Sequence, residues 1–340
     1  MFLIIFSIIL ISFKCILTQN SFNKYPKRED FQDEIDGKKI DLYFLTNING
    51  YEISITNYGG IIVSIMAPNR ENQFENIVNG FSTLKEYINH HKKGMKINSL
   101  LGRYANQIKN GEFILDNKLY KINDNSNFGE KVWTANQINS NELRLYLTSE
   151  DGDCGFPGRL HIEVIYTLND KNELKISYDA ITTKKTVINL SQRLFVNLEG
   201  GYNNEINNHI LNINSKLYLP TDENKIPLGD IVPVNNTKFD FKKGKIIGEQ
   251  KLDNYFIIDN KIAKKKQGYE KGVLLEVRKS GRIMYIYSTE PGFYIDSDKY
   301  GISIEPMNFP NSPNVGYFPN TILKPGHIYK QETIYKFDVK

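Results

Sequence analysis

The chain has little cysteine and no large excess of charge of either sign. Only two of its 340 residues are cysteines, Cys15 and Cys154, and Cys15 lies in an apolar leader that we expect to be removed. The remaining chain therefore cannot form an intrachain disulfide, which excludes a disulfide-stapled fold. Its 43 basic and 39 acidic residues leave a net charge of +4. This balance gives no reason to expect nucleic acid or a membrane surface as a partner.

The apolar run at the N-terminus is too short to span a membrane. Residues 2–13 are almost continuously apolar, whereas a transmembrane helix needs about 20 such residues. The run is typical of a secretory signal peptide, so we expect residues 1–19 to be cleaved and the protein to be secreted. A buried N-terminal strand or a short anchor is the alternative. Residues 20–36 are expected to form a loose arm before a single domain, residues 37–340.

Long stretches of helical periodicity are nearly absent, and alternation of apolar and polar residues dominates instead. His161–Leu168 alternates in this way, and the polar loop Asn169–Asn172 connects it to a second alternating run, Leu174–Tyr178. This pattern predicts a β-hairpin. Ser82–Asn89 is the best candidate for a short helix, with Ser82 as its N-cap. Many short strands and few helices favour an all-β sandwich or barrel.

One segment of twelve residues, Asn189–Gly200, carries the most information; it reads N-L-S-Q-R-L-F-V-N-L-E-G. Further informative segments are Thr56–Ile65, Gly102–Ile108, Gly152–Gly158, Tyr218–Glu223, Asp253–Phe256, Glu290–Gly292 and Ile304–Pro310. Together, in this order, they resemble the aldose 1-epimerases (galactose mutarotases). The family pattern for the first segment is N-L-T-N-H-S-Y-F-N-L-A-G. Each match is weak alone, and their common order over residues 50–335 indicates the family.

The resemblance implies a fold, a reaction and a partner. The fold is a large antiparallel β-sandwich, the galactose mutarotase-like supersandwich. The reaction interconverts the α and β anomers of a hexopyranose and uses no cofactor and no metal. The expected partner is a small hexose of the galactose or glucose type, and the expected state is a monomer or a weak dimer.

Three residues that the reaction needs are retained according to the resemblance. Opening a pyranose requires a base that takes the proton of the C1 hydroxyl and an acid that protonates the ring oxygen. Glu305 matches the family's glutamate base, although a solvated glutamate at a strand end is the alternative. Asp253 matches the aspartate that holds sugar hydroxyls, with a turn aspartate as the alternative. Asn106 matches an asparagine that faces the substrate.

Four departures lie at the same family site. Gln107 replaces an arginine, and Glu290 replaces a glutamine that contacts substrate. Arg193 stands at the position of the acid histidine. The family loop that brings a second histidine to the sugar has no counterpart, because the chain runs from Asn123–Gly129 directly to Trp133.

Arginine cannot take over the acid role of histidine. Its pKa lies above about 12, so it keeps its proton at neutral pH. Arg193 could still stabilise developing negative charge, but losing the proton transfer should lower the rate by roughly 100- to 10,000-fold. Two hypotheses compete. Either Arg193 forms an ion pair with Glu290 across the site, or Glu290 lies beside Glu305 and one of the two carboxyls stays protonated as the missing acid. His90 and His91 are interpreted as surface-loop residues.

Three functions follow from these residues. The first is a secreted mutarotase of impaired activity, with Glu305 as base and Arg193 in place of the acid histidine. The second is a sugar-binding protein that has lost catalysis. The third, an outlier, is a glycoside hydrolase that uses Glu290 and Glu305 as paired carboxylates.

Overall fold

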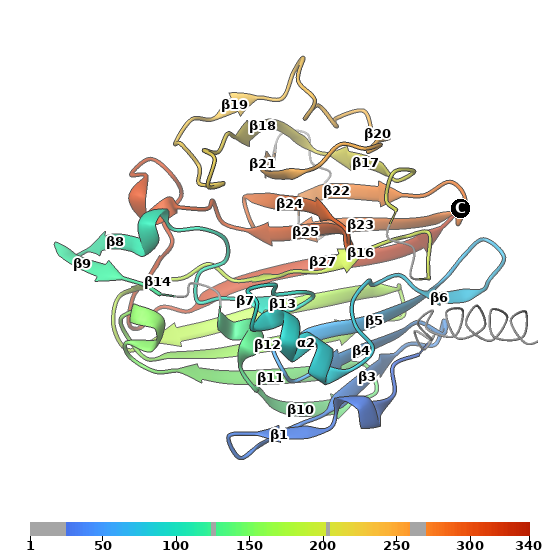
Figure 1. Ribbon diagram of the computed structural model, residues 1–340, viewed down its shortest axis with the longest axis horizontal. Coiled ribbons are helices and arrows are strands. Elements are labelled where there is room, and N and C mark those ends of the chain that lie inside the picture. The colour runs from blue at the N-terminus through green and yellow to red at the C-terminus, as the bar shows by residue number, and fades with distance from the viewer. Residues whose placement is uncertain (1–24, 124–126, 202–204, 259–269) are drawn as a thin grey trace, which may run out of the picture.

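Two layers of antiparallel β-sheet form the body of the protein. The computed structural model describes residues 25–123, 127–201, 205–258 and 270–340, so the expected signal peptide lies outside the described residues. One layer is a nine-stranded sheet whose strands follow one another from the bottom to the top of Figure 1. In spatial order they are β10 (Thr134–Asn139), β11 (Glu142–Ser149), β12 (Leu160–Leu168), β13 (Glu173–Thr182), β27 (Tyr329–Val339), β23 (Arg282–Ser288), β22 (Glu270–Glu276), β17 (Ile210–Ile213) and β20 (Lys245–Ile246).

The second layer consists of a six-stranded and a four-stranded sheet. The six-stranded sheet has the order β16 (Phe195–Val196), β25 (Gly301–Met307), β24 (Gly292–Asp298), β21 (Asp253–Ile258), β18 (Ser215–Leu219) and β19 (Val232–Pro233). The four-stranded sheet has the order β3 (Leu42–Thr46), β4 (Glu52–Thr56), β5 (Ile61–Pro68) and β6 (Phe74–Asn76). In Figure 1 the four-stranded sheet lies over the lower part of the nine-stranded sheet and the six-stranded sheet over the upper part.

The two layers share one apolar core. Val164 of β12, Ile55 of β4 and Ile295 of β24 all belong to the same buried cluster, although they come from three different sheets. Burial of this apolar surface is the main force that holds the layers together. The fold is therefore an antiparallel β-sandwich, as expected. The predicted hairpin is also confirmed, since β12 pairs with β13 along its whole length.

The remaining elements are short and lie around the two layers. They are η1 (Arg28–Phe31), β1 (Asp33–Ile35), β2 (Lys38–Ile40), α2 (Leu84–His91), β7 (Leu100–Leu101), η2 (Lys109–Gly111), β8 (Glu112–Leu115), β9 (Lys118–Lys121), η3 (Asn127–Glu130), η4 (Asp153–Gly155), β14 (Thr186–Val187), β15 (Ser191–Gln192), η5 (Ser312–Asn314) and β26 (Ile322–Leu323). No helix within the described ranges has the length and apolar character needed to cross a membrane.

The helix α2 begins one residue later than the sequence suggested. Its N-cap is Thr83, not Ser82, because the Thr83 side chain accepts a hydrogen bond from the Glu86 amide while the Glu86 carboxylate accepts one from the Thr83 amide. This reciprocal capping box requires Glu or Gln three residues after the cap. Ser82 has Lys85 at that position, so it cannot form the box.

Part of the expected N-terminal arm is packed onto the domain. Of residues 20–36, the structure describes those from Tyr25 onward. Phe31 in η1 has no exposed surface and belongs to an apolar cluster with Ile61 of β5 and Tyr87 of α2. The ring of Phe31 is thus covered by the sandwich and the helix together.

Strand alternation gives the six-stranded sheet one face in the shared core and a second face, here called the polar face, where carboxylates lie beside a smaller apolar cluster that includes Tyr255 and Met307. Along β24, Phe293 and Ile295 enter the shared core. Tyr294 and Asp296 between them point to the opposite face, because successive side chains of a strand alternate sides. On β25, Ile302 and Ile304 likewise face the core, which places Ser303 and Glu305 on the polar face. The candidate site lies on this face.

Candidate active site

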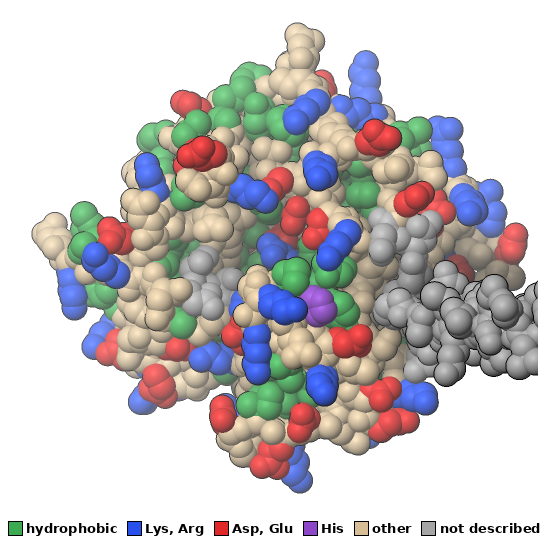
Figure 2. All heavy atoms as spheres, in the orientation of Figure 1, with side chains coloured by type: hydrophobic (Ala, Val, Ile, Leu, Met, Phe, Trp, Pro, Cys, Tyr) green, Lys and Arg blue, Asp and Glu red, His purple; other side chains and the backbone are tan. Residues whose placement is uncertain are grey.

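Three adjacent strands bring carboxylates together on the polar face of the six-stranded sheet. Asp253 of β21 lies opposite Asp296 of β24, and Asp296 lies opposite Ser303 of β25. In the neighbouring row, Tyr294 lies opposite Glu305. Directly opposite residues of antiparallel strands share a face. Figure 2 shows acidic and basic side chains gathered near the middle of the molecule, over the region where Figure 1 places β24 and β25.

Arg193 is held beside β25 by two very short strands. Before it, β15 pairs with β7 (Ser191 opposite Leu101), and after it, β16 pairs with β25 (Phe195 opposite Ser303). The Arg193 amide itself donates to the Ser99 carbonyl at 3.0 Å. Since the backbone is fixed on both sides, the side chain is directed to the polar face next to β25.

Arg193 forms a buried ion pair with Glu305. Its Nε donates to Glu305 Oε1 at 2.7 Å, and the Ser303 hydroxyl donates to the same oxygen at 3.0 Å. Glu305 is fully buried, and its second oxygen, Oε2, has no hydrogen-bond partner among the described residues. The Arg193 side chain keeps 24% of its surface exposed, so it separates Glu305 from solvent. Burial lowers the Arg193 pKa, but the attraction of Glu305 outweighs burial and holds this pKa above its ordinary value.

The expected ion pair between Arg193 and Glu290 is wrong. Arg193 is paired with Glu305 instead, and among the described residues no ion pair joins Arg193 to Glu290. Burial alone raises the pKa of Glu290 to about 7, with no contribution from Glu305 or Arg193. The charge of Glu290 acts on Tyr255 and Tyr329 instead, whose pKa values burial also raises. The expected like-charge pair of Glu290 and Glu305 is therefore also not formed.

Asp253 lies on the polar face but already has two partners. The Tyr294 hydroxyl donates to its Oδ1 atom, and the Lys225 ammonium pairs with its Oδ2 atom. The hydrogen bond with Asp253 raises the pKa of Lys225. Asp253, Lys225 and Asp296 together line one side of a groove with a volume of about 730 Å³. This groove gives small molecules access from solvent to Asp253 and Asp296, while Glu305 lies outside its lining.

Asn106 and Gln107 lie on a loop beside the end of β25. Asn106 is half-buried with a left-handed backbone (φ 63°), and its Oδ1 atom accepts from the Gln107 amide at 2.7 Å. The Gln107 carbonyl accepts from the Asn311 amide, while its side chain is exposed. The loop is anchored by Arg103, whose buried guanidinium donates to the carbonyls of Ser149, Glu150, Pro157 and Gly158.

Histidine is not available at this site within the described ranges. His90 and His91 belong to α2, so their assignment to a surface loop was wrong. His91 is fully buried, and its two ring nitrogens contact the carbonyls of Gly129 and Ile97. The ring of His90 stacks on Phe81 with 4.0 Å between the ring centroids. Neither ring contacts Glu305.

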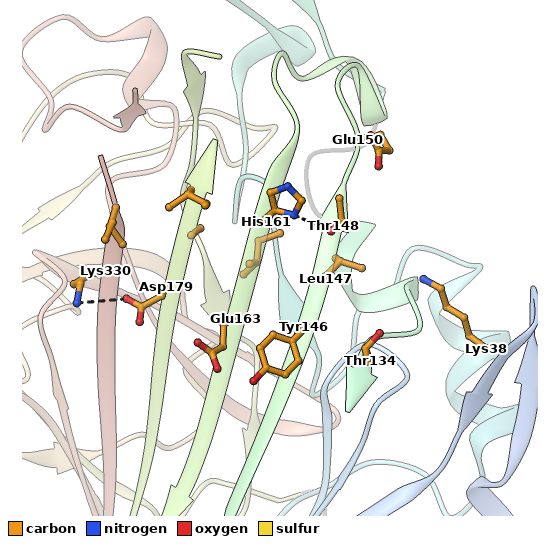
Figure 3. Close-up of a pocket in the computed structure, with 14 residues that line it drawn as sticks. Lys38, Thr134, Tyr146, Leu147, Thr148, Glu150, His161, Glu163, Asp179 and Lys330 are labelled. Carbon is orange, nitrogen blue, oxygen red and sulfur yellow. Dashed lines mark hydrogen bonds and ion pairs between the residues drawn. The ribbon is translucent and has the colours of Figure 1, made fainter. Parts of the chain in front are cut away.

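The described residues contain no cluster of three or more His, Cys, Asp or Glu side chains that could hold a metal ion. A second hollow of about 620 Å³ lies on the exposed face of the nine-stranded sheet (Figure 3). Its polar residues include His161, which is hydrogen-bonded to Thr148, and Asp179, which is paired with Lys330. None of the residues predicted for the site lines this hollow.

The family profile and the related proteins that match this chain all point to the same family. The sequence profile of the family described as aldose 1-epimerase matches residues 41–336. The galactose mutarotase of Sus scrofa is 32% identical over 318 residues, which cover 84% of this chain and 91% of the relative. The aldose 1-epimerase of Haemophilus influenzae is 30% identical over 342 residues, covering 89% of this chain and 97% of that protein.

Solved structures agree on the fold. A crystal structure of an aldose epimerase homologue from C. elegans has a TM-score of 0.80 at 24% identity and covers 88% of this chain and 98% of its own. The galactose 1-epimerase of Lactobacillus acidophilus has a TM-score of 0.76 at 21% identity, covering 91% and 97%. At these identities the likeness concerns the fold alone.

Proposed function

The chain belongs to the aldose 1-epimerase family, and we propose that it binds a hexopyranose and interconverts its anomers slowly, with Glu305 as the base. One observation supports this most. The buried Glu305 carboxylate has one oxygen fixed by Arg193 and Ser303, while its Oε2 atom has no partner. A buried carboxylate oxygen without a donor is costly for stability. Such an oxygen is suited to accept the proton of a substrate hydroxyl.

In the proposed reaction, residues on the polar face of the six-stranded sheet bind the sugar and move its protons. Asp253 accepts hydrogen bonds from sugar hydroxyls, in exchange for those of Lys225 and Tyr294. The C1 hydroxyl reaches Glu305 Oε2 when the Arg193 side chain moves aside, because Arg193 separates Glu305 from solvent. Glu305 takes the hydroxyl proton as the bond between C1 and the ring oxygen breaks, and the ring oxygen leaves as an alkoxide whose charge the displaced Arg193 guanidinium stabilises. The open aldehyde rotates, and the reverse transfers close the ring on the other face.

The rate is expected to be low because Arg193 is not an acid. Its guanidinium keeps its proton throughout, and the attraction of Glu305 strengthens this. Arg193 therefore stabilises charge without protonating the ring oxygen. If no other group of the site supplies this proton, the loss relative to a histidine acid is roughly 100- to 10,000-fold.

A sugar-binding protein without catalysis is the second candidate, favoured by the same ion pair. If Arg193 stays on Glu305 when sugar is bound, the base is never exposed. The groove and Asp253 would still hold a hexose. A glycoside hydrolase with paired Glu290 and Glu305 is not proposed, since these two carboxylates do not act on one another in the structure.

Polarimetry of freshly dissolved α-D-galactose and α-D-glucose separates the candidates. Acceleration over buffer that is lost in Glu305→Gln supports the mutarotase. A matched control is Asp179→Asn, on the far sheet, which should behave as the wild type. A rate equal to that of buffer, together with calorimetric binding of D-galactose, would support the binding protein instead.

We also propose that the chain is secreted after cleavage of residues 1–19. The support is the apolar run at residues 2–13, whose length fits a signal peptide. Expression of the full chain in a secreting cell and sequencing of the mature N-terminus would test this. Recovery of the protein only inside the cell, with Met1 retained, would contradict it.

A further inference from the structure

The strand register places one more carboxyl group beside the base. Asp296 occupies the central strand of the three that carry the site, directly opposite Asp253 on one side and Ser303 on the other. Ser303 donates a hydrogen bond to Glu305, which is two residues further along the same strand. Asp296 and Glu305 therefore share one face and occupy neighbouring rows of the sheet.

Asp296 differs from Glu305 and Asp253 in that neither of its carboxyl oxygens is held by a charged side chain in the described part of the chain, whereas Glu305 has only its Oε2 atom unpaired. Glu305 is held by Arg193 and Ser303, and Asp253 is held by Lys225 and Tyr294. Asp296 makes no hydrogen bond or ion pair with any residue in the described ranges. It is half-buried and lines the groove of about 730 Å³. A ligand in this groove would meet the Asp296 carboxyl directly.

The surroundings of Asp296 favour its protonated form. Burial is the largest cause, and it raises the pKa of Asp296 to about 7 although Arg193 acts in the opposite direction. The charged groups that act on Asp296, from its own strand and from the elements packed around it, are Arg193, Lys225, Asp253, Asp298 and Glu305. Three of the five are carboxylates, which add to the effect of burial. A carboxyl group with such a pKa can both donate and accept a proton at neutral pH.

We propose that Asp296 is the acid of this site, donating its proton to the ring oxygen of the bound sugar. This rests on the proposed function and names the group that replaces the missing histidine. As the bond between C1 and the ring oxygen breaks, the Asp296 proton moves to the ring oxygen and the C1 hydroxyl proton moves to Glu305. When the ring closes on the other face, Asp296 takes back its proton and Glu305 returns the other. No proton is gained or lost over the cycle.

Glu290 fits this role less well, although burial raises its pKa to the same value. Its charge acts on Tyr178, Tyr255 and Tyr329 rather than on Arg193 or Glu305. It also does not line the groove. A carboxyl group needs both a suitable pKa and a position beside Glu305 to act as the acid of this reaction, and Glu290 has only the suitable pKa.

The test compares Asp296→Asn, Glu305→Gln and the control Asp179→Asn by polarimetry of α-D-galactose between pH 5 and 9, with calorimetry of D-galactose on each protein. Asp296→Asn should bind the sugar yet lose roughly 100-fold or more in rate. The wild-type rate should fall as the pH rises through about 7, because only protonated Asp296 is an acid. The profile of the wild type needs no variant, so it tests the proposal even if Asp296→Asn fails to fold.

The outcomes separate this proposal from the proposed function. If Glu305→Gln loses activity while Asp296→Asn keeps the wild-type rate and pH profile, the role of Asp296 is overturned and the mutarotase remains. A wild-type rate without the decline above pH 7 overturns the role of Asp296 in the same way. A wild type that does not accelerate mutarotation at all overturns both.

Discussion

The Arg193 guanidinium and the Glu305 carboxylate form an ion pair with 2.7 Å between Nε and Oε1, and Glu305 has no exposed surface. The same contact stabilises a buried charge and keeps that charge away from solvent. Stability and activity therefore depend on Arg193 in opposite ways. A substitution that exposes Glu305 to substrate also removes the partner of a buried ion.

Replacing Arg193 alone should destabilise the fold. Arg193→Met leaves the buried Glu305 carboxylate without its cation, which typically costs about 3–5 kcal/mol. Urea denaturation at pH 7 would measure the loss. The double variant Arg193→Met/Glu305→Gln should recover most of it, because no buried charge remains. Equal stability of the single and double variants would show that the pair is not coupled.

Restoring histidine at position 193 should raise the rate of mutarotation. A histidine has an ordinary pKa near 6.5 and can protonate the ring oxygen. Because the wild type has Asp296 as its acid, the gain is measured in the Asp296→Asn background, where Arg193→His should recover roughly 100-fold in rate at pH 7 by polarimetry of α-D-galactose. Arg193→Ala is the matched control, since it uncovers Glu305 without adding an acid. If both variants gained equally, access to the base rather than proton donation would limit the rate.

Removing the charge of Glu290 should stabilise the protein at neutral and alkaline pH. Burial raises the folded-state pKa of Glu290 from 4.5 to about 7. A raised carboxyl pKa means that the folded state binds the proton more tightly, so stability is full below about pH 4.5 and falls as the pH rises to about 7. The loss is on the order of 3 kcal/mol.

Glu290→Gln should abolish that part of the pH dependence. Thermal unfolding at pH 5 and pH 8 would show a smaller difference between the two pH values in the variant than in the wild type. Glu223→Gln, at an exposed glutamate, is the control and should leave the difference unchanged. A variant with the full wild-type difference would show that Glu290 is not the group responsible.

Asp253 should contribute to sugar affinity rather than to the proton transfers. Hydrogen bonds to a charged group contribute about 1.5–3 kcal/mol, so Asp253→Asn should weaken D-galactose binding by roughly 10- to 100-fold. Calorimetry would measure the dissociation constant, with Asp179→Asn as the control. An unchanged constant would place the sugar away from the groove lined by Asp253 and Asp296.

The sequence was sufficient for the fold because its strand signals are local. Alternation in His161–Leu168 needs only the residues of one strand, and the hairpin that it predicts is confirmed. The start of α2 was missed by one residue since Ser82 and Thr83 are both good N-caps. Only the position of Glu86 distinguishes them, as it completes the box with Thr83.

The site was harder to predict because it depends on register between strands. Arg193 and Glu290 both differ from the family pattern, and this suggested that they form an ion pair. A sequence pattern does not give the distance between two side chains, so the ion pair could not be tested from the sequence. The pairing of β24 with β25 places Tyr294, not Glu290, opposite Glu305. Asp296 was overlooked although a signal existed. The alternation in Gly292–Asp298, folded back at Lys299 and Tyr300, places Asp296 on the same face as Glu305.

Because β24 contributes one face to the core and the other to the site, its structure limits how this site can evolve. Its odd-numbered residues Phe293 and Ile295 are part of the core, and its even-numbered residues Tyr294 and Asp296 carry the chemistry. A point substitution at the half-buried Asp296 can therefore change the chemistry with little harm to folding, whereas Tyr294 is buried in a second apolar cluster. An insertion or deletion of a single residue would exchange the two sets and lose both at once. We expect lineages of this protein to vary position 296 while the length of β24 stays constant.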